Sequence, residues 1–438
     1  MYKAGFCEAD ITPPLGSIIP GDFKARYNIG ILDRIYTRAA VIYDGENKAA
    51  IATIDACGIY KDVAERVRER VAAHTDIAPE AIMVTATHTH SGGPTLDWGE
   101  EVRQDPNYIT HIVNTTADAI IKANADAMEG EEVSLVNASK DVDEVGYIRI
   151  YKMKDGSYKT HGTPNTPELM EDHYTTPDNE LRIIATMSHS RPTGAIVNFA
   201  CHPAGVAGVK TSGDYVGALS RAMKRMYGPD FVTVFINGAC GNINHIDIFN
   251  PETRVKGRHI YMGERLAAAA AELISGNPEK LSGKIAYTSE PVALRLRRPT
   301  KEAVEAAYDT LMNLGDNYEN SKPGTPNYTD TFFAMQAMMR MLDKRTAIDT
   351  SVQLIDLAGV KIAGYPVQLF TEFGKATKAA IPGAMVSIFA NDYLGYGPYP
   401  DAMRPGVYEA TLCATSKLAP EAGDMLVNAA IEANKRLG

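Results

Sequence analysis

Short apolar runs alternate along the chain with longer stretches in which apolar residues recur every three or four positions. The runs at residues 39–43 and 49–55 flank a polar turn, and this pattern predicts two strands. Between residues 62 and 73, valines recur at every fourth position among charged residues, which is typical of an amphipathic helix. A further apolar run at residues 81–84 predicts another strand. Strand, helix and strand in this order favour a right-handed crossover unit in an α/β domain.

The same two patterns predict most of the remaining elements. We expect helices at residues 105–128, 213–227, 258–275 and about 420–437, and strands at residues 133–136, 147–151, 182–187, 194–200, 231–236, 284–296, 351–358, 360–364 and 385–389. Residues 162–179, rich in proline, threonine and acidic side chains, predict a surface loop. Two helices at 300–315 and 330–343 predict an inserted helical hairpin within about residues 300–345. The predicted fold class is α/β, a mixed β-sheet core flanked by helices, in a single domain over residues 1–438.

Composition and charge narrow the class of protein. Of the 438 residues, 45% are hydrophobic and 22% are charged, as in a soluble globular protein. The net charge of −10 and the dispersed basic residues argue against a nucleic-acid partner and against binding to an anionic membrane. Five cysteines without a Cys-x-x-Cys pair indicate reduced thiols, and the N-terminus lacks the apolar segment of a secretory signal. We therefore expect a cytoplasmic protein with a small-molecule substrate; self-association into a homo-oligomer stays open.

The stretch THTHSG at residues 87–92 follows the predicted strand at 81–84. In a strand, residues i and i+2 point to the same face, so we expect His88 and His90 to project together where the strand ends. Ligand-binding and catalytic groups tend to occupy loops of this kind. Two surface histidines on a polar turn would show the same spacing, so the motif needs support from other residues.

Two residues far away in the chain supply that support, because His202 and Glu372 also follow apolar strands. With His88 they form the ligand set of many catalytic zinc sites, two histidines and a carboxylate with one position open for water. Zinc lowers the pKa of that water toward neutrality and polarises a carbonyl oxygen. Each residue also has a plainer interpretation. His202, before Pro203, is also explained as a hydrogen-bonded core histidine, and Glu372 as a carboxylate at the N-terminus of the next helix.

Other polar residues near strand ends are less informative. Asp10 and Asp55 are candidates for hydrogen bonds to the metal-binding histidines, although burial and packing account for them equally well. The glycine-punctuated loop at residues 237–242 lacks the lysine and the spacing of a phosphate-binding loop, so we do not expect a nucleotide there. Cys240 in this loop has no basic neighbour, which favours a packing role over that of a nucleophile.

Several of these stretches together resemble the catalytic domain of the neutral, non-lysosomal ceramidase family. The stretches are ADITPP at 9–14, THTHSG at 87–92, NFACHP at 198–203, FINGACGNIN at 235–244, and ANDYLGY at 390–396 with Tyr408-Glu409. Their order and spacing agree over roughly residues 4–410 and are similar to those of a short, bacterial-type member. The resemblance implies hydrolysis of an amide with one zinc ion.

The resemblance also implies residue roles. His88 and His202 would bind zinc, with Glu372 as the carboxylate ligand, although the family has Gly-Glu where this chain has Thr-Glu. The tyrosine ligand would be Tyr396 or, by a shift of three residues, Tyr393.

Three further residues would act on the substrate. His90 would be the general acid/base beside the metal-bound water, and Arg149 would occupy the place of a substrate-binding arginine. Tyr408 would be a second tyrosine of the site, and its spacing to Tyr396 favours Tyr396 over Tyr393 as the ligand.

Three departures from the family shape the functional prediction. We expect no C-terminal immunoglobulin-like domain, and Gly238 stands where the animal enzymes have a serine assigned to catalysis. The polar segments at 162–179 and 300–345 offer no apolar surface for two lipid chains. We therefore predict a zinc-dependent amidohydrolase that cleaves a linear amide of a small or polar N-acyl substrate through a metal-activated water. The alternatives are a true ceramidase acting on N-acylsphingosine, an esterase, and a non-catalytic binding protein that retains the metal site.

Overall fold

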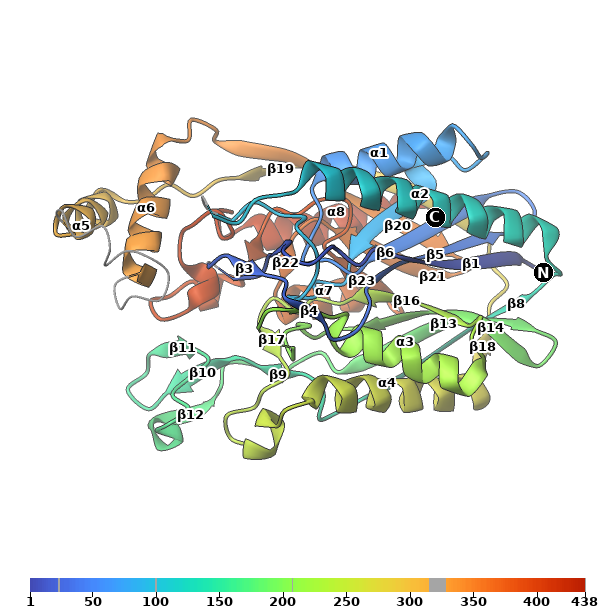
Figure 1. Cartoon of the computed structure of the whole chain (residues 1–438), viewed down its shortest axis with the longest axis horizontal. Helices are drawn as coiled ribbons and strands as arrows, with labels where there is room; N and C mark the ends of the chain where they lie inside the picture. Colours follow the sequence, from blue (N-terminus) through green and yellow to red (C-terminus); the bar gives the residue numbers. More distant parts are fainter. Residues whose placement is uncertain (23, 99–100, 207, 315–327, 438) are drawn as a thin grey trace.

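The computed structural model describes the chain except residues 23, 99–100, 207, 315–327 and 438. Helices and mixed sheets build a mixed α/β fold, as the sequence predicts, and the largest sheets among the described residues have five, four and four strands. The strands occupy the middle of the molecule, with α1 and α2 along one side and α3 and α4 along the opposite side (Figure 1).

The first sheet contains the predicted strand–helix–strand unit. It has the order β1 (Lys3–Asp10), β5 (Tyr36–Tyr43), β6 (Lys48–Ile54), β7 (Ile82–Ala86), and it carries the helices α1 (Lys61–Ala72) and α2 (Pro106–Glu129). β6 and β7 pair in parallel and are joined through α1, which confirms the crossover. The sequence pattern did not predict β1. A glycine permits the close approach of α2 to β1, because a Cβ on Gly5 would lie 2.0 Å from the Ala123 carbonyl oxygen.

The second sheet carries the other histidine segment. Its order is β16 (Val232–Asn237), β14 (Arg191–Phe199), β13 (Glu180–Ser188), β8 (Ser134–Asp141), β18 (Glu279–Lys280), and it is covered by α3 (Asp214–Tyr227) and α4 (Arg258–Ser275). β14 and β16 run in parallel, so the loops that follow Phe199 and Asn237 leave the sheet at the same edge. Functional groups collect at such an edge in α/β sheets.

The third sheet continues the core toward the C-terminus. Its order is β19 (Ile285–Arg295), β20 (Ala347–Leu357), β21 (Val360–Tyr365), β23 (Met385–Ile388), with α7 (Thr371–Ala380) and α8 (Ala422–Leu437) nearby in the chain. An isolated bridge between Thr85 and Ala390 joins it to the first sheet. Between the sheets lies a fully apolar cluster that includes Met83, Ile196, Val234 and Ile362. Burying each such side chain stabilises the fold by about 1.5–3 kcal/mol relative to exposure.

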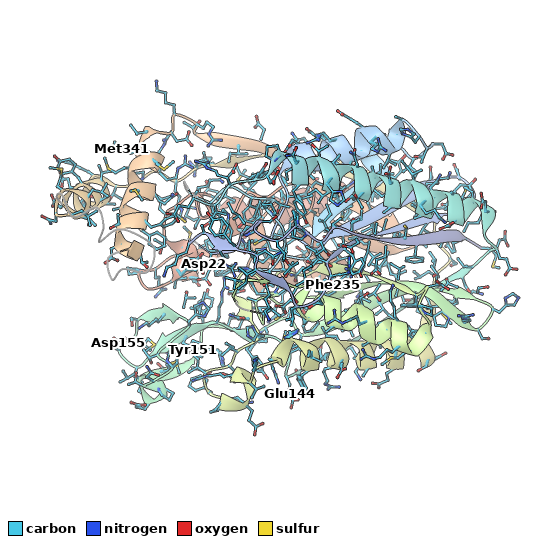
Figure 2. All side chains as sticks on the ribbon, in the orientation of Figure 1. Asp22, Glu144, Tyr151, Asp155, Phe235 and Met341 are labelled. Carbon is cyan, nitrogen blue, oxygen red and sulfur yellow. The ribbon has the colours of Figure 1, made fainter. Side chains whose placement is uncertain are left out.

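The predicted helical hairpin is present, and it emerges from the end of the β19–β20 ribbon. It consists of α5 (Lys301–Met312) packed against α6 (Tyr328–Leu342), while most of the predicted polar loop between them lies outside the described residues. The hairpin projects from the end of the molecule opposite to the N-terminus, where Met341 is labelled in Figure 2. It is less polar than we expected, because Met312, Met339 and Leu342 expose 60%, 59% and 71% of their surface.

The segment at 162–179 is not entirely a loop. It contains the strand β12 (Met170–His173), which pairs with β10 (Ile150–Met153), and β10 also pairs with β11 (Tyr158–Thr160). The prediction was wrong there because a four-residue strand is determined by its partner rather than by its own composition. The remaining short strands form pairs: β2 (Ile18–Ile19) with β3 (Arg26–Tyr27), β4 (Gly30–Ile31) with β15 (Lys210–Thr211), β9 (Tyr147–Ile148) with β17 (Ile243–Asn244), and β22 (Gln368–Leu369) with β24 (Tyr396–Gly397).

In the part of the chain that the structure describes, no helix has both the length and the apolar character needed to cross a lipid bilayer.

Candidate metal centre

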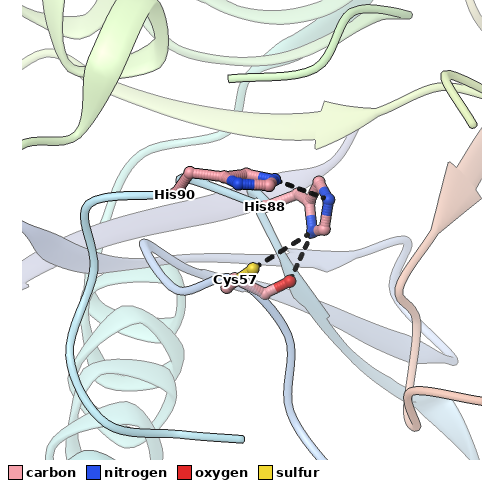
Figure 3. A group of neighbouring side chains, drawn as sticks. All are labelled: Cys57, His88 and His90. Carbon is pink, nitrogen blue, oxygen red and sulfur yellow. Dashed lines mark hydrogen bonds between the residues drawn. The ribbon is translucent and has the colours of Figure 1, made fainter. Parts of the chain in front are cut away.

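The two histidines of the THTHSG stretch meet, but not for the reason that the sequence suggested. β7 ends at Ala86, and His88 has a left-handed backbone conformation with φ of 70°. The segment is therefore a turn rather than the end of an alternating strand, and the prediction about its backbone was wrong. The turn nevertheless brings the Nε2 atoms of His88 and His90 to 3.2 Å from each other, with the two rings nearly perpendicular at 88° (Figure 3).

His202 joins this pair from the second sheet. Its Nε2 atom lies 3.2 Å from the Nε2 atom of His88, and both side chains are almost completely buried. The loops that carry them are tied together, because the backbone N–H of His90 donates a hydrogen bond to the carbonyl of Pro203. Three imidazoles therefore converge through their Nε2 atoms.

The opposite ring nitrogens explain why the Nε2 atoms point inward. Each Nδ1 atom is within hydrogen-bond distance of a backbone carbonyl: His88 of Cys57 at 2.5 Å, His202 of Cys240 at 2.7 Å, and His90 of Gly21 at 2.9 Å. A carbonyl oxygen only accepts, so each Nδ1 carries the proton and each Nε2 presents a lone pair. Lone pairs that face one another at 3.2 Å repel, and a shared cation relieves that repulsion.

The charge state of the histidines fits the same interpretation. Burial lowers the pKa of His88 and His202 well below the ordinary value, and positive neighbours, including Arg149, lower both further. Burial, with Arg26 as the next cause, lowers the pKa of His90 to about 3. Neutral imidazole is the form that binds a metal ion.

Cys57 offers a second grouping with the same histidines. Ligand atoms of Cys57, His88 and His90 lie within 4.8 Å of one another, so these three residues could hold a metal ion. The Cys57 sulfur, however, is 3.7 Å from the Nδ1 atom of His88, which already donates to the Cys57 carbonyl. Burial also raises the pKa of the Cys57 thiol to about 12. The lone-pair geometry therefore favours His202 over Cys57 as the third member of the cluster.

Arg149, Tyr396 and Tyr408, which the sequence predicts in the same site as the histidines, form a cluster of their own. Arg149, on the segment between β9 and β10, donates from Nε to Glu409 Oε1 at 2.5 Å and from Nη2 to the Tyr396 hydroxyl at 3.0 Å. The rings of Tyr396 and Tyr408 meet edge to face, with centroids 5.8 Å apart. The charge of Arg149 contributes to the lowered pKa of each of the three histidines, which places the two clusters in one electrostatic environment.

Tyr393, the other tyrosine that the sequence left open, has a different environment. Its hydroxyl accepts a hydrogen bond from Gln368 Nε2 at 2.6 Å, and its ring lies near Trp98 and Phe389. Phe389 in turn stacks on the His88 imidazole, with centroids 4.1 Å apart.

Glu372 is less directly connected to the histidines. It lies in the first turn of α7, where Oε2 accepts a hydrogen bond from Asn242 Nδ2 at 3.0 Å. Oε1 is buried without a hydrogen-bond partner among the described residues, and burial raises the pKa of the carboxyl group. Asn242 is two residues from Cys240, whose carbonyl orients His202. The described contacts therefore link Glu372 to the histidines only through this loop.

The aspartates near the strand ends do not contact the histidines. Asp55 accepts from Arg38 Nη1 at 2.9 Å, and Asp10 pairs with Arg34. Of the two interpretations that the sequence left open for these aspartates, packing and ion pairing therefore hold, because backbone carbonyls take the place beside the histidines. A carbonyl leaves no signal in the sequence. The sequence analysis also gave no role to Glu409, which it named only as the neighbour of Tyr408.

Gly238 leaves no space for a serine nucleophile. A Cβ atom built there would lie 2.8 Å from the Cβ of Ala200. The structure therefore has no place for a hydroxyl group at position 238.

Comparisons with known proteins agree with the fold and with the motif stretches in residues 2–245. A family model described as neutral/alkaline non-lysosomal ceramidase, N-terminal, matches residues 2–245. Among solved structures, the neutral ceramidase from Pseudomonas aeruginosa superposes with a TM-score of 0.72 at 18% identity, over 99% of this chain and 75% of that chain. A ceramidase complexed with C2 gives 0.71 at 17% identity, with the same coverage. A search of curated protein sequences finds no significant match.

Proposed function

Because this chain belongs to the neutral/alkaline non-lysosomal ceramidase family, we propose that it is a zinc-dependent hydrolase that cleaves the amide bond of a small or polar N-acyl substrate. The observation that carries the proposal is the convergence of three Nε2 lone pairs, each fixed by a carbonyl on the opposite side of the ring.

The donor set suits one zinc ion. His88 and His202 would bind through Nε2, and the unpartnered Oε1 of Glu372 would supply the carboxylate. Tyr396, next to Arg149, would be the fourth ligand. Imidazole nitrogens with carboxylate oxygen are ordinary ligands of catalytic zinc. A zinc ion bound there would supply a water of lowered pKa and would polarise the substrate carbonyl.

The remaining chemistry falls to residues of the chain. His90 is neutral, and its Nδ1 is held by Gly21, so its Nε2 accepts a proton from the attacking water. Arg149 donates hydrogen bonds to the oxygen that becomes negative when the water adds to the carbonyl carbon. His90 then delivers the proton to the amide nitrogen as the C–N bond breaks. The products are a carboxylic acid and an amine.

A cavity beside Tyr408 suits a substrate of moderate size. It has a volume of about 790 Å³ and is lined in part by Lys159, Thr160, His161 and Phe333. Small-molecule sites commonly measure about 300–1,000 Å³. Hydroxyl, imidazole and ammonium groups on its wall would bind the polar part of a substrate, beside apolar side chains such as Met153, Phe333 and Pro405.

A true ceramidase activity is the second candidate, and the helical hairpin favours it. Met312, Met339 and Leu342 expose apolar surface there, and Phe333 of α6 also lines the cavity. A long acyl chain would find apolar contacts along this route. The sequence alone did not predict this surface.

A substrate panel tests the proposal. Purified protein with zinc is assayed against short N-acyl amides, the matching esters and a long-chain ceramide. We expect the highest kcat/KM for a short amide. Exclusive turnover of ceramide would establish the second candidate, exclusive turnover of esters would make the protein an esterase, and binding without turnover of any substrate would contradict a catalytic function.

A further inference from the structure

We propose that Glu409 is a positioning residue that holds the Arg149 guanidinium in the orientation needed by the substrate. This inference rests on the proposed function, because Arg149 matters only if a negative charge develops on a substrate oxygen. In the sequence, Glu409 stands out only as the neighbour of Tyr408. Its assignment comes from the contacts of the buried pair.

The carboxylate of Glu409 is fully buried and fixed on both oxygens. Oε1 accepts from Arg149 Nε at 2.5 Å, and Oε2 accepts from Thr160 Oγ1 at 2.7 Å. The backbone carbonyl of Glu409 also accepts from the Ser416 hydroxyl at 2.5 Å. A carboxylate held at both oxygens and at its backbone cannot rotate away from its partner.

The guanidinium group of Arg149 makes hydrogen bonds through Nε and Nη2 but not through Nη1 to the described residues. Nε faces Glu409, and Nη2 donates to the Gly241 carbonyl at 2.8 Å and to the Tyr396 hydroxyl at 3.0 Å. Nη1 makes no hydrogen bond in the described part of the chain, and it is not among the enclosed polar atoms that lack a partner. Glu409 and Gly241 therefore fix the rigid guanidinium plane and leave the Nη1 donors available to a ligand.

Arg149 is connected to the wall of the cavity described above through its neighbours. Thr160 and Tyr408 line the cavity described above, and Thr160 is the second partner of Glu409. His161, another lining residue, donates its backbone N–H to the Arg149 carbonyl at 2.7 Å. Glu409 therefore connects the cavity wall to the group that would stabilise the transition state.

The first experiment changes the charge of Glu409 and preserves its shape. In Glu409→Gln, the amide oxygen can still face Arg149 and the amide N–H can donate to the Thr160 hydroxyl, so the fold is retained. We expect kcat on a short N-acyl amide to fall about 10- to 100-fold, with KM changed less than about twofold and zinc content unchanged. The matched control is Glu180→Gln, which removes the charge from a carboxylate that pairs with Arg182 and Lys378 outside the site and should leave kcat unchanged.

The second experiment uses guanidinium as a substitute for the missing side chain. Millimolar guanidinium should restore part of the activity lost in Arg149→Ala, because it can bind to the Glu409 carboxylate in the space left by the arginine side chain. It should not restore activity in the double variant Arg149→Ala/Glu409→Gln. A purely structural role for Glu409 predicts equal rescue in both backgrounds.

The outcomes separate this inference from the proposed function. Unchanged kcat in Glu409→Gln, or equal rescue in the single and double variants, would overturn the positioning role. If the wild-type protein hydrolyses no amide, the proposed function fails, and calorimetric binding of guanidinium to the two Arg149→Ala backgrounds decides whether Glu409 holds that group. Tighter binding to the single variant supports the inference, and equal binding contradicts it.

Discussion

The Nε2 atoms of His88 and His202 lie 3.2 Å apart although 114 positions separate the two residues in the chain. They come from different sheets, on the loops that follow β7 and β14. A hydrogen bond from Asn237 Nδ2 to the Thr87 carbonyl at 2.9 Å joins these regions. The contact between the two histidines therefore lies in the core and is fixed by the packing of the two sheets.

Replacing either histidine should abolish the metal site. In His88→Ala and His202→Ala, we expect zinc content below about one-tenth of the wild-type value and activity reduced at least about 100-fold, because the same ion supplies the water and polarises the carbonyl. Elemental analysis of the purified variants measures the first quantity. Full zinc content in either variant would show that the ligand assignment is wrong.

Cys57→Ala distinguishes a metal site that includes His202 from one formed by Cys57, His88 and His90. If the ligands converge through Nε2, this variant keeps its zinc, because only the Cys57 carbonyl is used and alanine retains it. We expect a modest loss of stability, about 1 kcal/mol, from the small space left by the buried sulfur. Loss of zinc with His202 unchanged would instead support the cluster of Cys57, His88 and His90.

Glu372→Gln separates a metal ligand from a helix-terminal carboxylate. As a ligand, Glu372 should be needed for tight binding, so we expect zinc affinity to fall about 10- to 100-fold or more. As a carboxylate in the first turn of α7, it would contribute only about 0.3–1 kcal/mol to stability and nothing to metal binding. Zinc titration against a competing chelator, together with urea unfolding of the metal-free protein, gives both quantities.

Much of the fold could be predicted because its elements are long and regular. The helices α2 and α4 were predicted within one or two residues of their bounds, since alanine-rich amphipathic stretches with clear ends carry their own signal. The strands β1 and β12 were not predicted as strands. Their positions depend on pairing with β5 and β10, and a pairing partner is not visible in a local pattern.

The histidines of the candidate site could be predicted from the sequence, but the groups that hold them in position could not. His88, His90 and His202 each follow a strand, and strand ends in such folds meet at one edge. The left-handed turn at His88 and the carbonyls that hold the rings could not be predicted, because any residue has a carbonyl. Neither could the role of Glu409, which follows from one contact with a residue 260 positions away.

The unfolding free energy should depend on pH through Asp214, and this prediction concerns the scaffold behind His202. Asp214 is fully buried with φ of 54°, and its oxygens accept from the backbone N–H groups of Val206 at 2.7 Å and Tyr215 at 2.6 Å. Burial is the main cause that raises its pKa from 3.8 to about 6. A raised folded-state pKa means that the contribution of Asp214 to stability is complete below about pH 4 and is lost as the pH rises through 6.

The size of this effect is about 3 kcal/mol, since each pKa unit corresponds to about 1.4 kcal/mol. Asp214→Asn removes the titration and suits a left-handed backbone, because asparagine tolerates positive φ. The difference in unfolding free energy, wild type minus variant, should therefore decrease by about this amount between pH 4 and pH 7. Urea unfolding of both metal-free proteins at each pH unit measures it. A difference that stays constant or increases with pH would mean that Asp214 is ionised in the folded protein throughout this range.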